Sequence, residues 1–288
     1  MSTPTLARAQ RFQLPSAHTG REYAISLYRP GPSPFTGAPA DCPIGVVLDG
    51  AMTFGTAVES TELRAALGQL RPAVIVGVAH DTDLVTAMRL RSRDFTTPAP
   101  SDKYPELAPL IGTEYGAADS FLEFLTQELL PGIQARAPEA STTQRVLFGY
   151  SLAGLFVAHV LLKRPTAFTT YVASSPSLWW NEFAVLRNQS GFRERLAGHE
   201  AGIRVLVTVA STEQDLPTRA LPGVDLFAAQ ERVRQARMVD AAREFSEWLR
   251  SFKLSQLEFV CFQGEDHGSV VAAALSRGLT FALRINTV

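Results

Sequence analysis

The 288-residue sequence is poor in several features, and each scarcity excludes a class of protein. Only two cysteines occur, Cys42 and Cys261, so a disulfide framework and a metal site built on paired cysteines are both excluded. The formal net charge is only −1, so no overall field favours a nucleic acid or an anionic membrane as partner. No apolar run approaches the ~20 residues that a membrane-spanning helix needs.

The N-terminus shows no signal peptide, because residues 1–15 contain no continuous apolar core. We therefore expect a cytoplasmic protein. Apolar residues, in contrast, are abundant: the chain is 46% hydrophobic and 19% charged. This composition lets one large α/β domain bury a sizeable core, so the sequence predicts a single domain over residues 1–288.

Continuous apolar runs, without alternation of polar residues, mark most of the predicted strands. Such runs are typical of strands that are buried on both faces, as in a parallel sheet covered by helices. They lie at 44–48, 73–78, 146–148, 171–173, 203–209 and 257–262. Two earlier runs, 9–14 and 23–28, flank a turn-rich stretch and predict an antiparallel hairpin at the sheet edge.

Helical patterns lie between these runs, at 59–70, 120–133 and 239–252, and their apolar stripes are interpreted as core packing. Alternating strands and helices predict a doubly wound α/β fold, with a mostly parallel central sheet, an antiparallel N-terminal hairpin and helices on both faces. Two stretches, at about 88–116 and 211–225, show little periodicity. Long irregular segments at the carboxyl ends of strands commonly form the binding site, so we expect both to be loops that line a pocket.

The segment 149–154 carries the strongest chemical signal. It places Ser151 between small residues, directly after a β-prone run and directly before an apolar helical run. This is the pattern of a nucleophile elbow, a tight strand-to-helix turn that exposes a serine hydroxyl. The usual motif is G-x-S-x-G; here the last place is Ala153, with Gly154 one step later, and we interpret this as a tolerated variant. The alternative is an ordinary turn between a strand and a buried helix.

A serine hydroxyl is a poor nucleophile unless an imidazole takes its proton and a carboxylate orients that imidazole. In this fold the three residues follow the chain order serine, acid, histidine. His267 lies just past the last predicted strand, where the base is expected. Glu213 and Asp215 both follow the strand at 203–209; Glu213 is nearer to its end and is favoured as the acid, and Asp215 remains the alternative.

An ester hydrolase also needs two backbone N–H groups that stabilise the developing oxyanion. The amide of Leu152, at the start of the elbow helix, is the first candidate. The second is the amide of Ala51, in the segment that follows the strand at 44–48, where Gly50 permits a sharp bend.

The substrate pocket is expected around the adjacent tryptophans Trp179 and Trp180, which follow the strand at 171–173. Aromatic side chains at a strand's carboxyl end can form the wall of a pocket for a bulky or aromatic group. The alternative is that one is a core residue and the other is exposed. Arg89, Arg91 and Arg93 are candidate contacts for an anionic or catecholate-like substrate, and the alternative is that they belong to a solvated surface. We expect Met52 and Tyr150 to complete the pocket.

Several short motifs occur together in one order along the chain. R-x-R-D-F-T at 91–96 and S-P-S-L-W-W at 175–180 are the most specific; the others lie at 48–50, 76–78, 149–156 and 211–214. On these motifs the chain resembles the esterase D and enterochelin-esterase-like α/β-hydrolases, a group that holds siderophore trilactone esterases. The resemblance extends from roughly Gln10 to the C-terminus. Members of the family commonly have glycine where Ala153 stands.

The resemblance implies Ser151 as nucleophile and His267 as base, and it supports Glu213 as the acid. The function expected is that of a serine carboxylic ester hydrolase that works through an acyl-enzyme on a small-molecule ester, without a metal or an organic cofactor. Siderophore-like or other bulky aromatic esters are the expected substrates. A thioesterase or acyltransferase on the same residues, and a non-catalytic binding protein that keeps the fold, remain as alternatives.

Overall fold

A computed structural model describes residues 6–32, 37–187, 189–219 and 225–285, and these residues form an eight-stranded sheet. The strand order is β1-β2-β4-β3-β5-β6-β7-β8. β1 pairs antiparallel with β2 and β2 with β4, whereas all other neighbours are parallel. The strands are β1 Ala9–Pro15, β2 Glu22–Tyr28, β3 Cys42–Leu48, β4 Val74–Ala79, β5 Ala140–Tyr150, β6 Thr170–Ser174, β7 Arg204–Ala210 and β8 Gln256–Phe262. The predicted mostly parallel sheet with an N-terminal hairpin is confirmed.

Burial explains why the central strands have no alternating pattern. Every residue of β3 and of β6 is buried, because both strands lie inside the sheet and have helices on both faces. β1 is an edge strand, and its residues alternate between partly buried and exposed over most of its length. The local sequence pattern of each strand therefore follows its place in the sheet.

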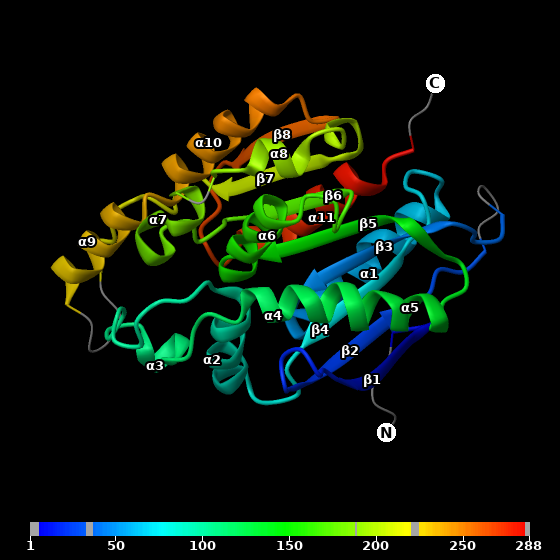
Figure 1. Cartoon of the computed structure of the whole chain (residues 1–288), viewed down its shortest axis with the longest axis horizontal. Coiled ribbons are helices and arrows are strands. Elements are labelled where there is room, and N and C mark those ends of the chain that lie inside the picture. Colours follow the sequence, from blue (N-terminus) through cyan, green and yellow to red (C-terminus); the bar gives the residue numbers. More distant parts are fainter. Residues whose placement is uncertain (1–5, 33–36, 188, 220–224, 286–288) are drawn as a thin grey trace.

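Helices cover both faces of the sheet, as predicted (Figure 1). α1 and α11 pack side by side on one face, and α4, α5, α6 and α10 contribute to the larger core on the other. Among the residues described, no helix is long and apolar enough to cross a membrane. The helices are α1 Gly50–Ala66, α2 Leu84–Phe95, α3 Ala108–Ile111, α4 Ala118–Glu123, η1 Phe124–Leu129, α5 Leu130–Arg136, α6 Leu152–Lys163, α7 Trp180–Arg187, α8 Phe192–Leu196, η2 Glu200–Gly202, α9 Leu226–Ala236, α10 Met238–Leu249, η3 Arg250–Phe252 and α11 Val270–Leu283.

The first helix begins earlier than the predicted segment 59–70. Only Asp49 separates β3 from α1, and its left-handed backbone (φ 55°) turns the chain directly into the helix. Gly50 then passes so close to β4 that a Cβ atom would lie 2.7 Å from the carbonyl carbon of Gly77. The turn therefore depends on glycine, and it places the start of α1 at the carboxyl edge of the sheet.

The expectation of an irregular loop over 88–116 is wrong in part, because α2 runs to Phe95 and α3 lies within the segment. The α2 helix is capped by Asp83, whose carboxylate accepts a hydrogen bond of 3.0 Å from the Thr86 N–H. Its apolar stripe is weak because it buries polar residues, among them Arg91 and Asp94. A buried ion-pairing face has no hydrophobic period, so the pattern did not indicate a helix.

The second predicted loop, 211–225, lies partly outside the described residues, which omit 220–224. Its first part consists of turns, and it ends where α9 begins. Residues 211–213 follow β7 directly, at the same edge of the sheet as the start of α1.

Candidate active site

Ser151 occupies the turn between β5 and α6 in a strained backbone conformation, with φ 60° and ψ −118°. A positive φ at a non-glycine residue costs on the order of 1–3 kcal/mol and persists only where the surroundings enforce it. The enforcing contacts are hydrogen bonds: the Ser151 N–H donates to the carbonyl of Ser174 at 3.0 Å, and its own carbonyl accepts from the Leu155 N–H at 2.9 Å. The hydroxyl therefore stands at the carboxyl end of β5, beside the first turn of α6.

The glycine requirements of this turn explain how alanine is accommodated at position 153. A Cβ atom on Gly149 would lie 2.2 Å from the carbonyl oxygen of Ala153, and one on Gly154 would lie 2.6 Å from that of Ser174. The close backbone approaches thus fall on Gly149 and Gly154. Ala153 itself is fully buried in the core.

The structure brings Ser151, His267 and Glu213 together, although 116 residues separate the serine from the histidine. The Ser151 Oγ lies 3.1 Å from the His267 Nε2, and the His267 Nδ1 lies 2.8 Å from the Glu213 Oε1. A carboxylate can only accept, so the proton belongs on Nδ1 and Nε2 is free to accept from the serine hydroxyl. The Glu213 side chain is only 1% exposed, whereas that of His267 is 46% exposed.

Of the two carboxylates that the sequence left open, Glu213 is the one that contacts the histidine. Asp215 is exposed, two residues further along the turn. Asp266, next to the histidine, instead accepts hydrogen bonds of 2.8 Å from the backbone amides of Gly268 and Ser269. These amides lower the pKa of Asp266 and hold the turn that carries His267.

The two loops that carry the acid and the base are joined by direct hydrogen bonds. The N–H and hydroxyl of Thr212 both donate to the carbonyl of Glu265, at 3.2 and 2.8 Å. The Gly264 N–H donates to the Ser211 hydroxyl at 2.9 Å. The distance between Glu213 and His267 is therefore supported by the backbone on both sides.

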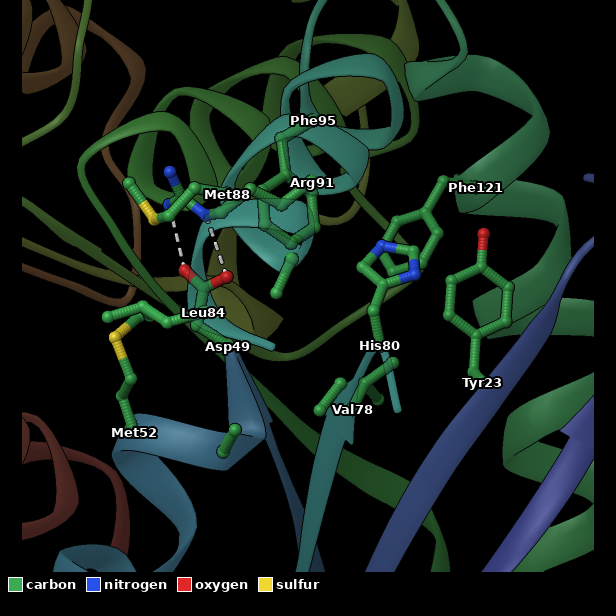
Figure 2. A pocket seen from close by; sticks show the side chains of 13 residues that line it. Tyr23, Asp49, Met52, Val78, His80, Leu84, Met88, Arg91, Phe95 and Phe121 are labelled. Carbon is green, nitrogen blue, oxygen red and sulfur yellow. Dashed lines mark hydrogen bonds and ion pairs between the residues drawn. The ribbon is translucent and has the colours of Figure 1, made fainter. Parts of the chain in front are cut away.

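Two predicted oxyanion donors lie at helix N-termini: Leu152 is the first residue of α6, and Ala51 is the second residue of α1. The first N–H groups of a helix have no intrahelical acceptor, and the helix dipole favours negative charge beside them. The negative charge of Asp49, two residues before Ala51, would oppose an oxyanion, but the Arg91 guanidinium binds this carboxylate through two hydrogen bonds of 2.7 and 2.8 Å (Figure 2).

The sequence from residue 16 to residue 253 matches the model of the Esterase family. The chain belongs to this family. It is 35% identical over 244 residues to a siderophore triacetylfusarinine C esterase of Aspergillus fumigatus, covering 83% of this chain and 80% of the relative. It is 33% identical over 274 residues to the ferri-bacillibactin esterase BesA of Bacillus subtilis, covering 93% and 87%.

Solved structures agree with the family assignment. The siderophore hydrolase EstA from Aspergillus nidulans superposes with a TM-score of 0.81 at 28% identity, over 98% of this chain and 97% of that one. The resemblance to siderophore esterases that the sequence motifs indicated is therefore confirmed, and so is the α/β-hydrolase fold.

A small cavity lies between the start of α1, the end of β4 and α2 (Figure 2), and Ala51 is among the residues that line it. Its volume is about 40 Å³. A single water needs about 10–15 Å³, so the cavity has room for a small group. Met52 is 47% exposed and also lines this cavity. The remaining lining residues are Tyr23, Asp49, Val78, Ala79, His80, Leu84, Ala87, Met88, Arg91, Phe95 and Phe121.

Of the two adjacent tryptophans, one is in the interior and the other is at the surface. Trp180 is 1% exposed and its indole N–H donates to the carbonyl of Thr97 at 3.2 Å, so the expectation that it lines the pocket is corrected. Trp179 stays partly exposed and packs edge-on against Tyr104. Adjacent residues at a helix start point in different directions, so only one of them reaches the surface.

The two arginines of the R-x-R motif have different surroundings. Arg93, predicted to meet the substrate, is partly exposed and lies 3.3 Å from the carboxylate of Asp94, its own neighbour. Arg91, also expected as a substrate contact, is 4% exposed and binds Asp49, so that expectation is wrong. The motif was the only sequence signal that set Arg91 apart, because a lone arginine in a polar segment normally indicates a solvated surface.

The sequence did not indicate Ser177 as a site residue. In the structure its hydroxyl oxygen lies 3.4 Å from that of Ser151.

Proposed function

We propose that this chain hydrolyses carboxylic esters through an acyl-enzyme on Ser151. The observation that carries the proposal is the continuous contact from the Ser151 Oγ through the His267 imidazole to the Glu213 carboxylate, at 3.1 and 2.8 Å. The serine oxygen attacks the ester carbonyl carbon while Nε2 of the histidine takes the hydroxyl proton. The amides of Leu152 and Ala51 stabilise the oxyanion of the tetrahedral intermediate.

The second half of the reaction uses the same groups in reverse. When the intermediate collapses, His267 returns its proton to the departing alcohol, and the acyl group stays on Ser151. Water then loses a proton to Nε2 and attacks the acyl carbon, which releases the acid and restores the serine. Throughout, the buried Glu213 carboxylate keeps the proton of the imidazole on Nδ1 and stabilises the imidazolium that forms twice per turnover.

The decisive experiment compares the wild type with Ser151→Ala on p-nitrophenyl acetate. We expect kcat to fall by at least about 10³-fold, as when a triad nucleophile is removed. Ser246→Ala is a matched control, because this buried serine on α10 has a hydroxyl with no partner among the described residues. Equal turnover by wild type and Ser151→Ala would contradict the proposal. Labelling of Ser151 by a fluorophosphonate probe separates an active site from a binding protein that merely keeps the fold.

We further propose that the ester belongs to a siderophore or a similar bulky aromatic compound. The named relatives at 35% and 33% identity support this. Aromatic arms of such a compound would lie on the open side of the site, where Trp179 is partly exposed. A catecholate trilactone should be hydrolysed with a higher kcat/KM than p-nitrophenyl acetate, and a strong preference for the plain ester would refute this substrate class.

A further inference from the structure

The proposed base, His267, is held in place by few contacts of its own. It lies on the loop between β8 and α11, and almost half of its side chain is exposed. Glu213 contacts only the Nδ1 atom, so this hydrogen bond alone leaves the ring free to tilt about it. A general base must keep Nε2 within hydrogen-bond reach of the proton that it takes, so something else must fix the plane of the ring.

Tyr150 contacts His267 at two separate points. The two rings face one another, with centroids 4.9 Å apart and planes inclined by 37°. The Tyr150 hydroxyl donates a hydrogen bond to the backbone carbonyl of His267. The tyrosine therefore restrains both the imidazole plane and the main chain from which the imidazole extends. Burial, reinforced by the Glu213 carboxylate, raises the pKa of Tyr150, so the phenol remains a donor throughout the working pH range.

Tyr150 is itself held in place through its backbone carbonyl. It is the last residue of β5, adjacent to Ser151, and its carbonyl accepts a hydrogen bond of 3.2 Å from the Arg91 guanidinium. Arg91 is buried and binds the Asp49 carboxylate through two further hydrogen bonds (Figure 2). Asp49 precedes α1, whose second residue is Ala51. One chain of contacts thus links the start of α1, the serine turn and the histidine loop.

We propose that Tyr150 is a positioning residue, which holds the His267 imidazole in line with the Ser151 hydroxyl and is anchored in turn by the Arg91–Asp49 ion pair. The inference rests on the proposed ester hydrolysis. It replaces the expectation that Tyr150 contacts the substrate: its hydroxyl and one ring face are already occupied by the histidine. Loss of the tyrosine should therefore impair the proton transfer and leave substrate binding nearly unchanged.

The test compares Tyr150→Phe, which keeps the ring and loses the hydroxyl, with Tyr150→Leu, which loses both. We expect Tyr150→Phe to lower kcat about fivefold, the effect of one hydrogen bond. Tyr150→Leu should lower kcat about 10²-fold, because small misplacements of a reacting group have effects of this size. In both variants KM should stay within about twofold of the wild type, as expected when ground-state binding is unaffected. Fluorophosphonate labelling of Ser151 should slow in parallel with kcat.

A second readout does not depend on turnover. The His267 Nδ1 proton, held between the ring and Glu213, should give a low-field resonance in the wild type. We expect Tyr150→Leu to lose this resonance through faster exchange with water, and Tyr150→Phe to retain it. Tyr171→Phe is the matched control: the Tyr171 hydroxyl also donates to a backbone carbonyl, that of Pro165 at 2.9 Å, but Tyr171 lies fully buried in β6. This control should lose thermal stability and keep both kcat and the resonance.

The outcomes separate the two proposals. If the wild type hydrolyses esters and Ser151→Ala does not, but Tyr150→Leu keeps wild-type kcat and the low-field resonance, the positioning role is refuted and the proposed function stands. A rise in KM with unchanged kcat in the Tyr150 variants would also refute the positioning role, because that result would show that Tyr150 contacts the substrate. If Ser151→Ala retains full activity, the proposed function fails, and the resonance alone then decides whether Tyr150 orders His267.

Discussion

At the scale of single residues, Glu213 is the carboxylate that accepts the hydrogen bond from Nδ1 of the His267 imidazole. This carboxylate is almost fully buried, and its Oε2 has no hydrogen-bond partner among the described residues. An unpartnered buried carboxylate oxygen carries a desolvation penalty, which is typical of a group retained for function. Asp215, two residues further on, is exposed and lacks such a constraint.

We therefore predict that Glu213→Gln and Asp215→Asn differ sharply in their effects on ester hydrolysis. The amide of Glu213→Gln favours the wrong tautomer of the imidazole, so kcat should fall by about 10³-fold or more, as in other triads. Asp215→Asn should stay within about twofold of the wild type, as is usual for an exposed position. Steady-state kinetics on p-nitrophenyl acetate measures both. A larger loss of kcat in Asp215→Asn than in Glu213→Gln would identify Asp215 as the acid.

At the scale of elements, one ion pair joins the end of β2 to the start of β5. Arg29 donates two hydrogen bonds, of 2.7 and 2.8 Å, to the two carboxylate oxygens of Glu139. These hydrogen bonds lower the pKa of Glu139 below its ordinary value. A carboxylate whose pKa is lower in the folded state stabilises the fold above its unfolded pKa, and this contribution is lost as the pH falls through the folded pKa.

Glu139→Gln should therefore lower the stability at neutral pH by about 1 kcal/mol, a modest value because Arg29 stays partly exposed to water. The difference in Tm between wild type and variant should shrink as the pH drops below the ordinary range of a glutamate. Thermal unfolding followed by circular dichroism between pH 7 and about 3.5 measures this. A difference in Tm that is constant over this range would show that the lowered pKa contributes nothing.

The α2 helix shows why one element was missed in the sequence. Apart from Phe95, its buried side chains are charged or hydroxyl groups, and two of them bind neighbouring elements: Asp94 accepts a hydrogen bond from Tyr23 at 2.8 Å, and Arg91 donates to Asp49. Sequence patterns detect helices by their apolar period, and these buried residues show none. The Asp83 cap was the available local signal.

At the scale of the whole molecule, burial is distributed unevenly. α6 is buried along nearly its whole length, at the centre of the larger core, whereas α9 has no fully buried residue. Phe227, near the start of α9, is 70% exposed. Segments with few buried contacts open at a lower free energy than the core.

Hydrogen exchange followed by mass spectrometry should therefore show α9 amides exchanging first, and those of α6 and β5 last. The expected separation is large, because core amides exchange only through global unfolding, whereas peripheral helices open locally. Equal protection of α9 and α6 would indicate that α9 is covered in solution by a partner or by another copy of the chain.

The sequence by itself determined the fold class and the position of the serine turn. Both follow from local physics: continuous apolar runs require burial on two faces, and the backbone contacts at Gly149 and Gly154 leave no room for a side chain. Only the tertiary structure decided that Glu213 meets His267, that Trp180 is a core residue, and that Arg91 binds Asp49. Such pairings depend on which strand ends lie side by side and on how their loops pack, and no local pattern encodes which of two nearby polar side chains turns inward.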